Sequence, residues 1–228
     1  MDETVLILLN GYVAKSKTFD NLVFFISANQ LVKGVPIAML FLFLWFRPRA
    51  CHLQKRAQLI ALLVVSFISI VVGRMAALLL PHRVRPIHSE ALDLELPLSI
   101  SSHTLDGWSS FPSDHAVLYA TLATAFWKVD RRAGIAAVVH AFFVIAFARV
   151  YLTLHFPTDI LGGAAIGLIL TLILMKPVSA SISRAGGLEL ADKWPQYFHP
   201  FLFLILFQIA TMFTSARQLA KAIVGLFT

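Results

Sequence analysis

The sequence predicts an all-α membrane protein, a polytopic helical bundle with about six transmembrane helices, and three observations lead to this fold class. The 228 residues are 58% hydrophobic, and their mean hydropathy is +0.79. Only 14% of them are charged, whereas a soluble domain carries about 25% charged residues. Apolar runs close to the roughly 20 residues that cross a membrane follow one another along the chain, with short polar loops between them.

Six apolar runs are the expected membrane spans. They cover residues of about 31–47, 57–80, 114–128, 133–152, 157–176 and 198–216. Pro81 ends the second run. Pro157 opens the fifth run in its first helical turn, where a proline leaves no intrahelical hydrogen bond unmade. Within that run, Gly163 and Gly167 have the spacing of a small-residue face for close helix packing. We expect residues 1–228 to form a single integral-membrane domain.

The segment 1–28 precedes the first full span. Its two apolar stretches, 4–14 and 21–28, are too short to cross a membrane and are separated by charged residues. We therefore predict an interfacial or re-entrant segment, with a single strained hairpin as the alternative. The chain opens without a basic region, and no small-residue cleavage site follows its short apolar run, so we expect no signal peptide.

The loop charges predict the orientation in the membrane. One set of loops carries ten basic residues, namely Arg47, Arg49, Lys55, Arg56, Lys128, Arg131, Arg132, Lys176, Arg184 and Lys193. The opposite loops, about 82–111 and 153–156, carry only Arg83 and Arg85. Because cytoplasmic loops are enriched in Lys and Arg, the second set is expected to face the periplasm or exterior of a bacterial inner membrane. The net charge of +7 thus reflects topology, and we expect no nucleic-acid partner.

Three polar clusters fall on this outward side. Because successive helices alternate direction, all three are expected at the same membrane face. The clusters are Arg74 with His82-Arg83-Val84-Arg85-Pro86, then Ser110-Phe111-Pro112-Ser113-Asp114-His115, and finally the stretch 148–159, ARVYLTLHFPTD. Together they define a motif-bearing core over residues 74–167.

The residue types in these clusters suit phosphoryl transfer. Arginine presents a planar fork of donors that matches phosphate oxygens. Ser113 stands where a helix is expected to begin, and a helix N-terminus binds anions. Of two histidines in one pocket, one can attack phosphorus while the other protonates the leaving oxygen. Asp159, four residues beyond His155, is close enough to orient that imidazole. No Cys or Glu cluster offers metal ligands, so we expect arginine charge and positioning in place of a metal, and no cofactor.

At this point the chain resembles a known family, the type 2 phosphatidic acid phosphatase (PAP2) superfamily. The resemblance rests on Arg149-x5-His155-x3-Asp159, on Pro112-Ser113-x-His115 and on Arg85-Pro86, in that family's order. The family consists of metal-independent phosphatases with a phospho-histidine intermediate, and it is related to the vanadium haloperoxidases. The resemblance therefore implies a PAP2/haloperoxidase-like helical core.

The resemblance also implies a role for each motif residue. His155 would be the nucleophile, Asp159 its orienting carboxylate, and His115 the general acid. The phosphate would be bound by Arg85, Ser113 and Arg149.

The first motif departs from the family pattern. Members of the family usually carry a Lys seven residues before the Arg-Pro pair, and this chain has Leu78 there. Arg74, on the same helical face, and Arg83 are the two candidates to supply the missing charge. Ala148 stands where the third motif usually has a Ser, which should matter little because Arg149 carries the charge.

The second motif reads PSDH, where many members have PSGH. With HFPTD in the third motif, this resembles the branch that includes bacterial undecaprenyl-diphosphate phosphatases of the BcrC type. The resemblance implies hydrolysis of undecaprenyl diphosphate to undecaprenyl phosphate and phosphate at the outer membrane face, in cell wall biogenesis. The expected partners are this polyprenyl lipid phosphate, or another lipid phosphate, and the membrane lipid.

Two alternatives stay open. The first is a phosphatase or phosphotransferase for another lipid phosphate, such as phosphatidylglycerol phosphate, phosphatidate or the phosphate of lipid A. The second, from another class, is a protein that binds or transports lipid phosphates without chemistry, although the complete pair of histidines argues against it. A haloperoxidase is disfavoured, because that branch is soluble and this chain is not.

Overall fold

The structure is a computed structural model that describes residues 2–47, 52–97, 100–186, 188–214, 218 and 222. Every regular element in these ranges is a helix. In chain order they are α1 (Asp2–Asn10), α2 (Lys17–Ala28), α3 (Gln30–Phe46), α4 (His52–Leu79), η1 (Pro86–His88), α5 (Asp114–Val129), α6 (Arg131–His140), η2 (Ala141–Phe147), α7 (Ala148–Tyr151), α8 (Pro157–Arg184), α9 (Glu189–Lys193) and α10 (Pro195–Ala210). The expected all-α class is confirmed.

Helical segments stand at all six predicted spans, with the run α6–η2–α7 forming the fourth. Three of these segments are long and apolar enough to cross a membrane by themselves, namely Leu53–Leu79, Arg131–Tyr151 and Pro157–Arg184. A fourth span results if α2 and α3, which meet at a bend of 52°, count as one. The remaining two, α5 and α10, have 16 residues each, which corresponds to about 24 Å. Arg49 and the end of the sixth predicted span lie outside the described residues.

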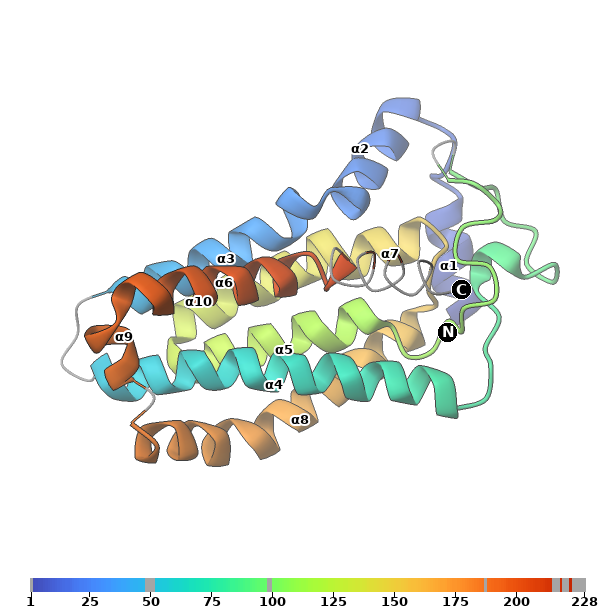
Figure 1. The fold of residues 1–228 in the computed structure, drawn as a ribbon. Coiled ribbons are helices and arrows are strands. Elements are labelled where there is room, and N and C mark those ends of the chain that lie inside the picture. The colour runs from blue at the N-terminus through green and yellow to red at the C-terminus, as the bar shows by residue number, and fades with distance from the viewer. Residues whose placement is uncertain are drawn as a thin grey trace.

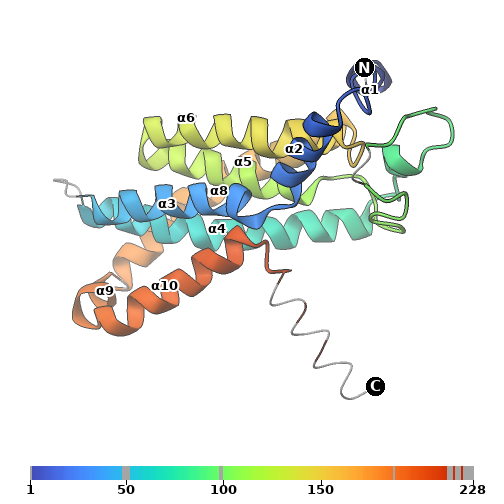
Figure 2. The ribbon, with the colours of Figure 1, turned by 90° about the horizontal axis from the view of Figure 1, so that it is seen from above.

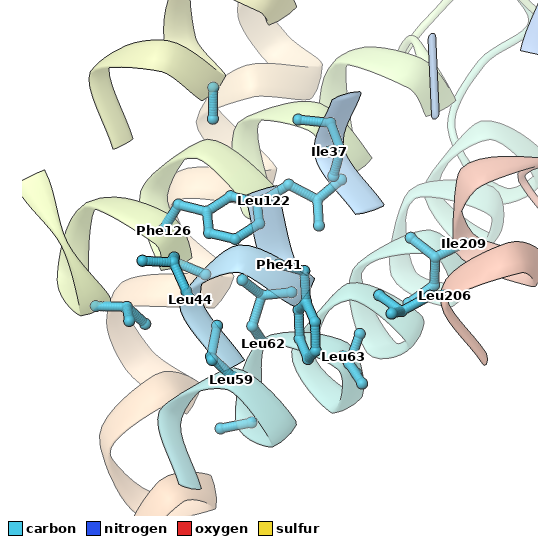
Figure 3. Packing of buried hydrophobic residues seen from close by; sticks show 14 of the residues in the cluster. Ile37, Phe41, Leu44, Leu59, Leu62, Leu63, Leu122, Phe126, Leu206 and Ile209 are labelled. Carbon is cyan, nitrogen blue, oxygen red and sulfur yellow. The ribbon is translucent and has the colours of Figure 1, made fainter. Parts of the chain in front are cut away.

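The bundle is built around α5. This helix packs against α4, α6 and α8, while α3 and α10 cover the α4 side (Figure 1). Phe41 of α3, Leu62 of α4 and Phe126 of α5 interdigitate in the main apolar cluster (Figure 3). Outward-facing side chains such as Phe143 and Phe201, each 62% exposed, are apolar as well. An apolar exterior of this kind suits lipid rather than water.

The contact between α5 and α8 is close because α8 presents two glycines to it. A Cβ added at Gly163 would lie only 2.7 Å from the carbonyl oxygen of Ser113. One helical turn further on, Gly167 meets the backbone of Val117 in the same way. The small-residue packing face predicted from the sequence is therefore confirmed. Its consequence is that the start of α5, with Ser113, lies against the first turns of α8.

The two ends of the bundle differ in content. The long connection after α4, the turn over residues 152–156 and helix α1 gather at one end, whereas α9 lies at the other (Figures 1 and 2). The three polar clusters of the sequence thus share one face, as predicted. We refer to this face as the site end of the bundle.

The N-terminal helices are attached to the site end. Helix α1 packs on α7 and α8, and its Leu6 is buried. The Asp20 carboxylate of α2 accepts a 2.6 Å hydrogen bond from the Tyr151 hydroxyl of α7 and a 3.1 Å bond from the backbone N–H of Ala14. After the bend, the Asn29 side chain caps the first turn of α3. The interfacial or re-entrant placement of residues 1–28 stays a prediction.

Candidate active site

A cavity of about 270 Å³ opens at the site end of the bundle. It unites residues from all three predicted clusters with one residue of α3. Its chemically active lining consists of Lys33, Arg74, Arg85, His115, Arg149 and His155. Within the described ranges, no group of three or more His, Cys, Asp or Glu side chains could hold a metal ion.

Backbone hydrogen bonds join the three motif segments. The N–H of Ser110 donates to the carbonyl of Arg83 at 2.8 Å, which links the second motif to the first. The N–H of Ser113 donates to the carbonyl of Asp159 at 3.3 Å, which links the second motif to the third. Segments far apart in the sequence therefore hold one another in register at the cavity.

His155 lies on the turn between α7 and α8 and is 4% exposed. Its Nδ1 lies 2.9 Å from the carbonyl oxygen of Ser110 and 3.7 Å from the carboxylate of Asp159. Its Nε2 lies 3.2 Å from the Arg85 guanidinium. Because a guanidinium donates and never accepts, Nε2 must be the acceptor and Nδ1 must carry the proton. The lone pair of Nε2 therefore faces the cavity side of the ring, toward Arg85.

The electrostatic surroundings keep His155 neutral. Burial, opposed in part by the nearby carboxylate of Asp159 and aided by the charges of Arg85 and Arg149, lowers the pKa of this imidazole to about 4. Desolvation disfavours the charged form of a histidine, which explains the direction. At neutral pH the ring is thus unprotonated.

Asp159 is fully buried in the first turn of α8, and both of its carboxylate oxygens accept hydrogen bonds from other residues of the protein. One carboxylate oxygen accepts from the Ser110 hydroxyl at 2.5 Å and from the N–H of Phe156 at 2.8 Å. The other oxygen accepts from Arg83 at 2.6 Å. A carboxylate fixed in this way can hold the His155 ring in a single orientation.

Arg83 and Arg74, the two candidates to replace the missing lysine of the first motif, have different positions in the structure. Arg83 is not among the residues that line the cavity, since its guanidinium pairs with Asp159 on one side and with Asp2 of α1, at 2.7 Å, on the other. Arg74 does line the cavity. It lies 3.6 Å from Asp114 and stacks on the Trp108 ring at 3.9 Å. Arg74 can therefore reach a ligand directly, whereas Arg83 holds Asp159.

The second histidine has an arginine of its own. Arg149 on α7 is 9% exposed, and its Nη2 donates to Nε2 of His115, in the first turn of α5, at 2.7 Å. The carbonyl of Arg149 accepts from the N–H groups of Leu154 and His155 at 3.1 and 3.3 Å. These backbone bonds in the turn after α7 fix the two histidine–arginine pairs relative to each other.

Arg85 is a fixed cation. Its guanidinium donates to the carbonyls of Trp108, Leu154 and Ser109 at 3.1, 2.7 and 3.0 Å. Burial lowers the pKa of Arg85 from its usual value, and the carboxylates of Asp159 and Asp114 counteract part of that effect. Because an arginine begins from a pKa above 12, it stays charged.

Ser113 precedes α5, as the sequence predicted, but its side chain does not cap the helix. The hydroxyl is buried and has no hydrogen-bond partner within the described part of the chain. A buried hydroxyl without a partner costs about 1–3 kcal/mol. Its neighbours Pro112 and Asp114 both line the cavity.

Sequence reasoning missed two residues of this site, Ser110 and Lys33. Ser110 bonds to both His155 and Asp159, and nothing in the motif spacing indicates that. Lys33 lines the cavity from α3. The sequence alone could have indicated Lys33, because a lysine inside an apolar span is a functional candidate by default.

Fold and site together define a class, an all-helical membrane protein whose cavity holds two histidines and several cations at one membrane face. The PAP2 superfamily model matches residues 79–182, the range that contains Arg85-Pro86, PSDH and the third motif. This segment of the chain is therefore similar to the PAP2 superfamily.

Individual relatives agree with this placement. The Escherichia coli (strain K12) protein named "Putative undecaprenyl-diphosphatase YbjG" is 34% identical over 142 residues, which cover 62% of this chain and 65% of that protein. The crystal structure of Aquifex aeolicus LpxE is similar with a TM-score of 0.52 and 23% identity, over 76% of this chain and 93% of that one. A PAP2-type phosphatidylglycerolphosphate phosphatase from Bacillus subtilis gives a TM-score of 0.52 and 24% identity, over 79% and 85%. These two likenesses support the fold.

Proposed function

We propose that the protein hydrolyses a lipid phosphate, and that its preferred substrate is undecaprenyl diphosphate, converted to undecaprenyl phosphate and inorganic phosphate. The observation that carries this proposal is the arrangement of two histidines, each bonded to its own arginine, around one cavity. The E. coli relative, by its printed name, supports the choice of an undecaprenyl diphosphate.

The first chemical step uses the lone pair of His155. Nε2 attacks the terminal phosphorus, a nitrogen–phosphorus bond forms, and the bond from phosphorus to the bridging oxygen breaks. The electron pair goes to that oxygen, which takes a proton from His115. A phosphate anion beside His115 favours a proton on this ring, because opposite charges stabilise the charged form. Asp159, 3.7 Å from Nδ1, stabilises the cationic phospho-imidazole in the way a triad carboxylate does.

The second step returns the enzyme to its starting state. Water attacks the phosphorus and gives its proton to His115, the nitrogen–phosphorus bond breaks, and its electron pair returns to Nε2 of His155. Arg85 and Arg149 donate hydrogen bonds to the phosphoryl oxygens in both steps, because transition-state charge in phosphoryl transfer spreads over these atoms. Arg74 supplements them from the end of α4.

The Ser113 hydroxyl fits the same scheme. It is buried without a partner at the N-terminus of α5, where the helix dipole also favours an anion. A bound phosphate would supply the missing acceptor.

An apolar groove supports a lipid substrate over a soluble phosphate. It measures about 500 Å³ and runs between α5, η2 and α8. Ala116, next to His115, and Ile160, next to Asp159, both line it. The groove shares no lining residue with the cavity, but it begins in the helical turns of α5 and α8 that carry His115 and Asp159. We assign it to the hydrocarbon chain of the substrate.

The proposed location is the bacterial inner membrane, with the cavity facing the periplasm or exterior. Among the described residues of the first set of loops, Arg56, Arg132 and Lys193 lie near helix ends away from the site. By the enrichment of basic residues in cytoplasmic loops, the site end is then outward.

The test is phosphate release by purified protein from undecaprenyl diphosphate, beside phosphatidylglycerol phosphate, phosphatidate and lipid A. His155→Ala is expected to lower release by roughly 10⁴-fold or more, because loss of a single catalytic group costs at least this much. His103→Ala, in an exposed loop with its side chain 85% exposed, is the matched control and should keep the wild-type rate. Substrate labelled in the terminal phosphate should yield an acid-labile phospho-histidine only when His155 is present.

Three outcomes would count against the proposal. His155→Ala that releases phosphate at the wild-type rate would remove the mechanism. Phosphate recovered on an acceptor alcohol instead of in solution would indicate a phosphotransferase. Binding of these lipids without release or labelling would indicate a non-catalytic protein.

A further inference from the structure

We propose that Lys33 of α3 forms a second phosphate subsite in the cavity, beside His115 and Arg149, and that this subsite selects lipid diphosphates over lipid monophosphates. The inference rests on the proposed function and specifies its substrate class. Lys33 lies outside the segment 79–182 that matches the PAP2 model, so the motif residues alone do not supply it.

Lys33 occupies an unfavourable position for a purely structural lysine. The residue is 5% exposed, and taking an ammonium out of water is costly. No carboxylate of the described residues lies within ion-pair distance of it. It also lies in the first turns of α3, after the cap at Asn29, where the positive end of the helix dipole disfavours a cation. Nothing in the described protein offsets these costs, whereas an anion in the cavity would.

The backbone of Lys33 is held in place from two sides. Its carbonyl accepts a 2.9 Å hydrogen bond from the His140 ring of α6. The next residue, Gly34, lies so close to α10 that an added Cβ would be 2.5 Å from the carbonyl oxygen of Ala210. Gln30, on the same face of α3, lines the cavity together with Lys33. The lysine therefore projects from a fixed helix rather than from a loose terminus.

The two histidine–arginine pairs give the cavity a direction. In the proposed mechanism His155 lies on the side of the phosphate that is transferred and His115 on the side of the leaving oxygen, and each ring is bonded to an arginine that holds the phosphoryl group between them. Lys33 belongs to the second side, because its carbonyl bonds to the His140 ring, and that ring lies 6.0 Å from the ring of Tyr119, one helical turn beyond His115 on α5.

This placement distinguishes the two substrate types. In a lipid diphosphate the leaving oxygen belongs to a second phosphate, which stays on the lipid and becomes more negative as the bond breaks. In a lipid monophosphate the leaving oxygen belongs to an alcohol, and no further anion is present. Lys33 can stabilise the departing group only in the first case.

The charge of the cavity agrees with a diphosphate. Its lining carries four cations, Lys33, Arg74, Arg85 and Arg149, and one carboxylate, Asp114. The excess of positive charge matches a headgroup with about three negative charges better than one with two.

The experiment compares two substrates with one hydrocarbon chain, farnesyl diphosphate and farnesyl monophosphate. Lys33→Met is expected to lower kcat/KM for the diphosphate by about 10- to 100-fold, as loss of a charged hydrogen bond does, and to change the value for the monophosphate by less than about 3-fold. Lys33→Arg should recover part of the diphosphate activity. Lys17→Met, which removes an exposed lysine at the start of α2, is the matched control and should leave both values unchanged.

The same variants separate this inference from the proposed function. An equal loss on both substrates, or no loss on either, would overturn the diphosphate subsite while leaving the hydrolase in place. If the wild-type protein hydrolyses neither substrate, the proposed function fails, and binding then tests Lys33 by itself. Inorganic pyrophosphate should raise the Tm of the wild type more than inorganic phosphate does, and Lys33→Met should abolish that difference. Equal Tm shifts in both proteins would overturn the inference.

Discussion

The PAP2 segment 79–182 and the N-terminal helices α1–α3 contribute to the site in different ways. The first contains both histidines and two of the four cations that line the cavity, Arg85 and Arg149, while Arg74 lies five residues before it. The second contains no recognisable motif, yet it places Asp2 against Arg83 and Lys33 in the cavity. A motif thus identifies the reacting groups, while a segment without one can still orient them and determine what binds.

The N-terminal helices contribute one residue that acts indirectly, Asp2, and one that lines the cavity, Lys33. Asp2 touches no reacting group, but it holds Arg83 and also accepts from the N–H of Thr158 at 3.0 Å. Arg83 in turn holds Asp159, which lies beside His155. Lys33, in contrast, faces the cavity directly.

The largest effect is expected within the PAP2 segment. His115→Asn should lower phosphate release by about 10²- to 10⁴-fold, because general acid–base catalysis contributes a factor of this size. Phospho-histidine formation and its hydrolysis should both slow, since one ring serves both steps. Rapid-quench labelling with terminally labelled substrate measures the two rates. A variant in which both rates stay at wild-type values would remove His115 from the mechanism.

An intermediate effect is expected where the two regions meet. Arg83→Gln and Asp2→Asn should each lower kcat by about 10-fold or less with KM nearly unchanged, since both residues orient Asp159 without lining the cavity. Because the two belong to one chain of contacts, the double variant should lose less than the sum of the single losses in free energy. Glu3→Gln, which neutralises an exposed acid in the same helix, should retain wild-type kcat. A change in KM with kcat unchanged would instead indicate that Arg83 binds substrate.

The smallest effect concerns pH. Since the pKa of His155 is lowered to about 4, the ring should stay neutral from pH 7 to about 5, where a free histidine with a pKa of about 6.5 would be protonated. Between pH 6.5 and 4 the unfolded chain then binds more protons at this position than the native protein does. Stability should therefore fall as the pH falls through this window and show no contribution from His155 above it.

Nitrogen NMR of histidine-labelled protein checks this prediction. The His155 signal, identified by its loss in His155→Asn, should keep the pattern of a neutral ring protonated at Nδ1 down to about pH 5. If the His155 ring instead became protonated near pH 6.5, burial and the neighbouring arginines would not lower its pKa as described.

Much of the fold followed from local sequence. Helix positions depend on runs of apolar residues and on caps and prolines within a few positions, so the helices at the six apolar runs, the start of α5 at Asp114 and that of α8 at Pro157 were predictable. The pairing of His155 with Asp159 was predictable for the same reason, since the two are four residues apart at a helix start.

Other features of the site were decided by tertiary structure. Arg83 and Arg74 are equivalent candidates in the sequence, but only packing brings Arg83 to Asp159, 76 positions away, and Arg74 to the cavity. The tautomer of His155 is set by the carbonyl of Ser110, 45 positions upstream. Lys33 reaches the cavity because α3 is held between α6 and α10. Charge and hydrophobicity along the chain thus determined which groups exist and which helices carry them. Long-range contacts, which no local pattern encodes, decided which of those groups meet.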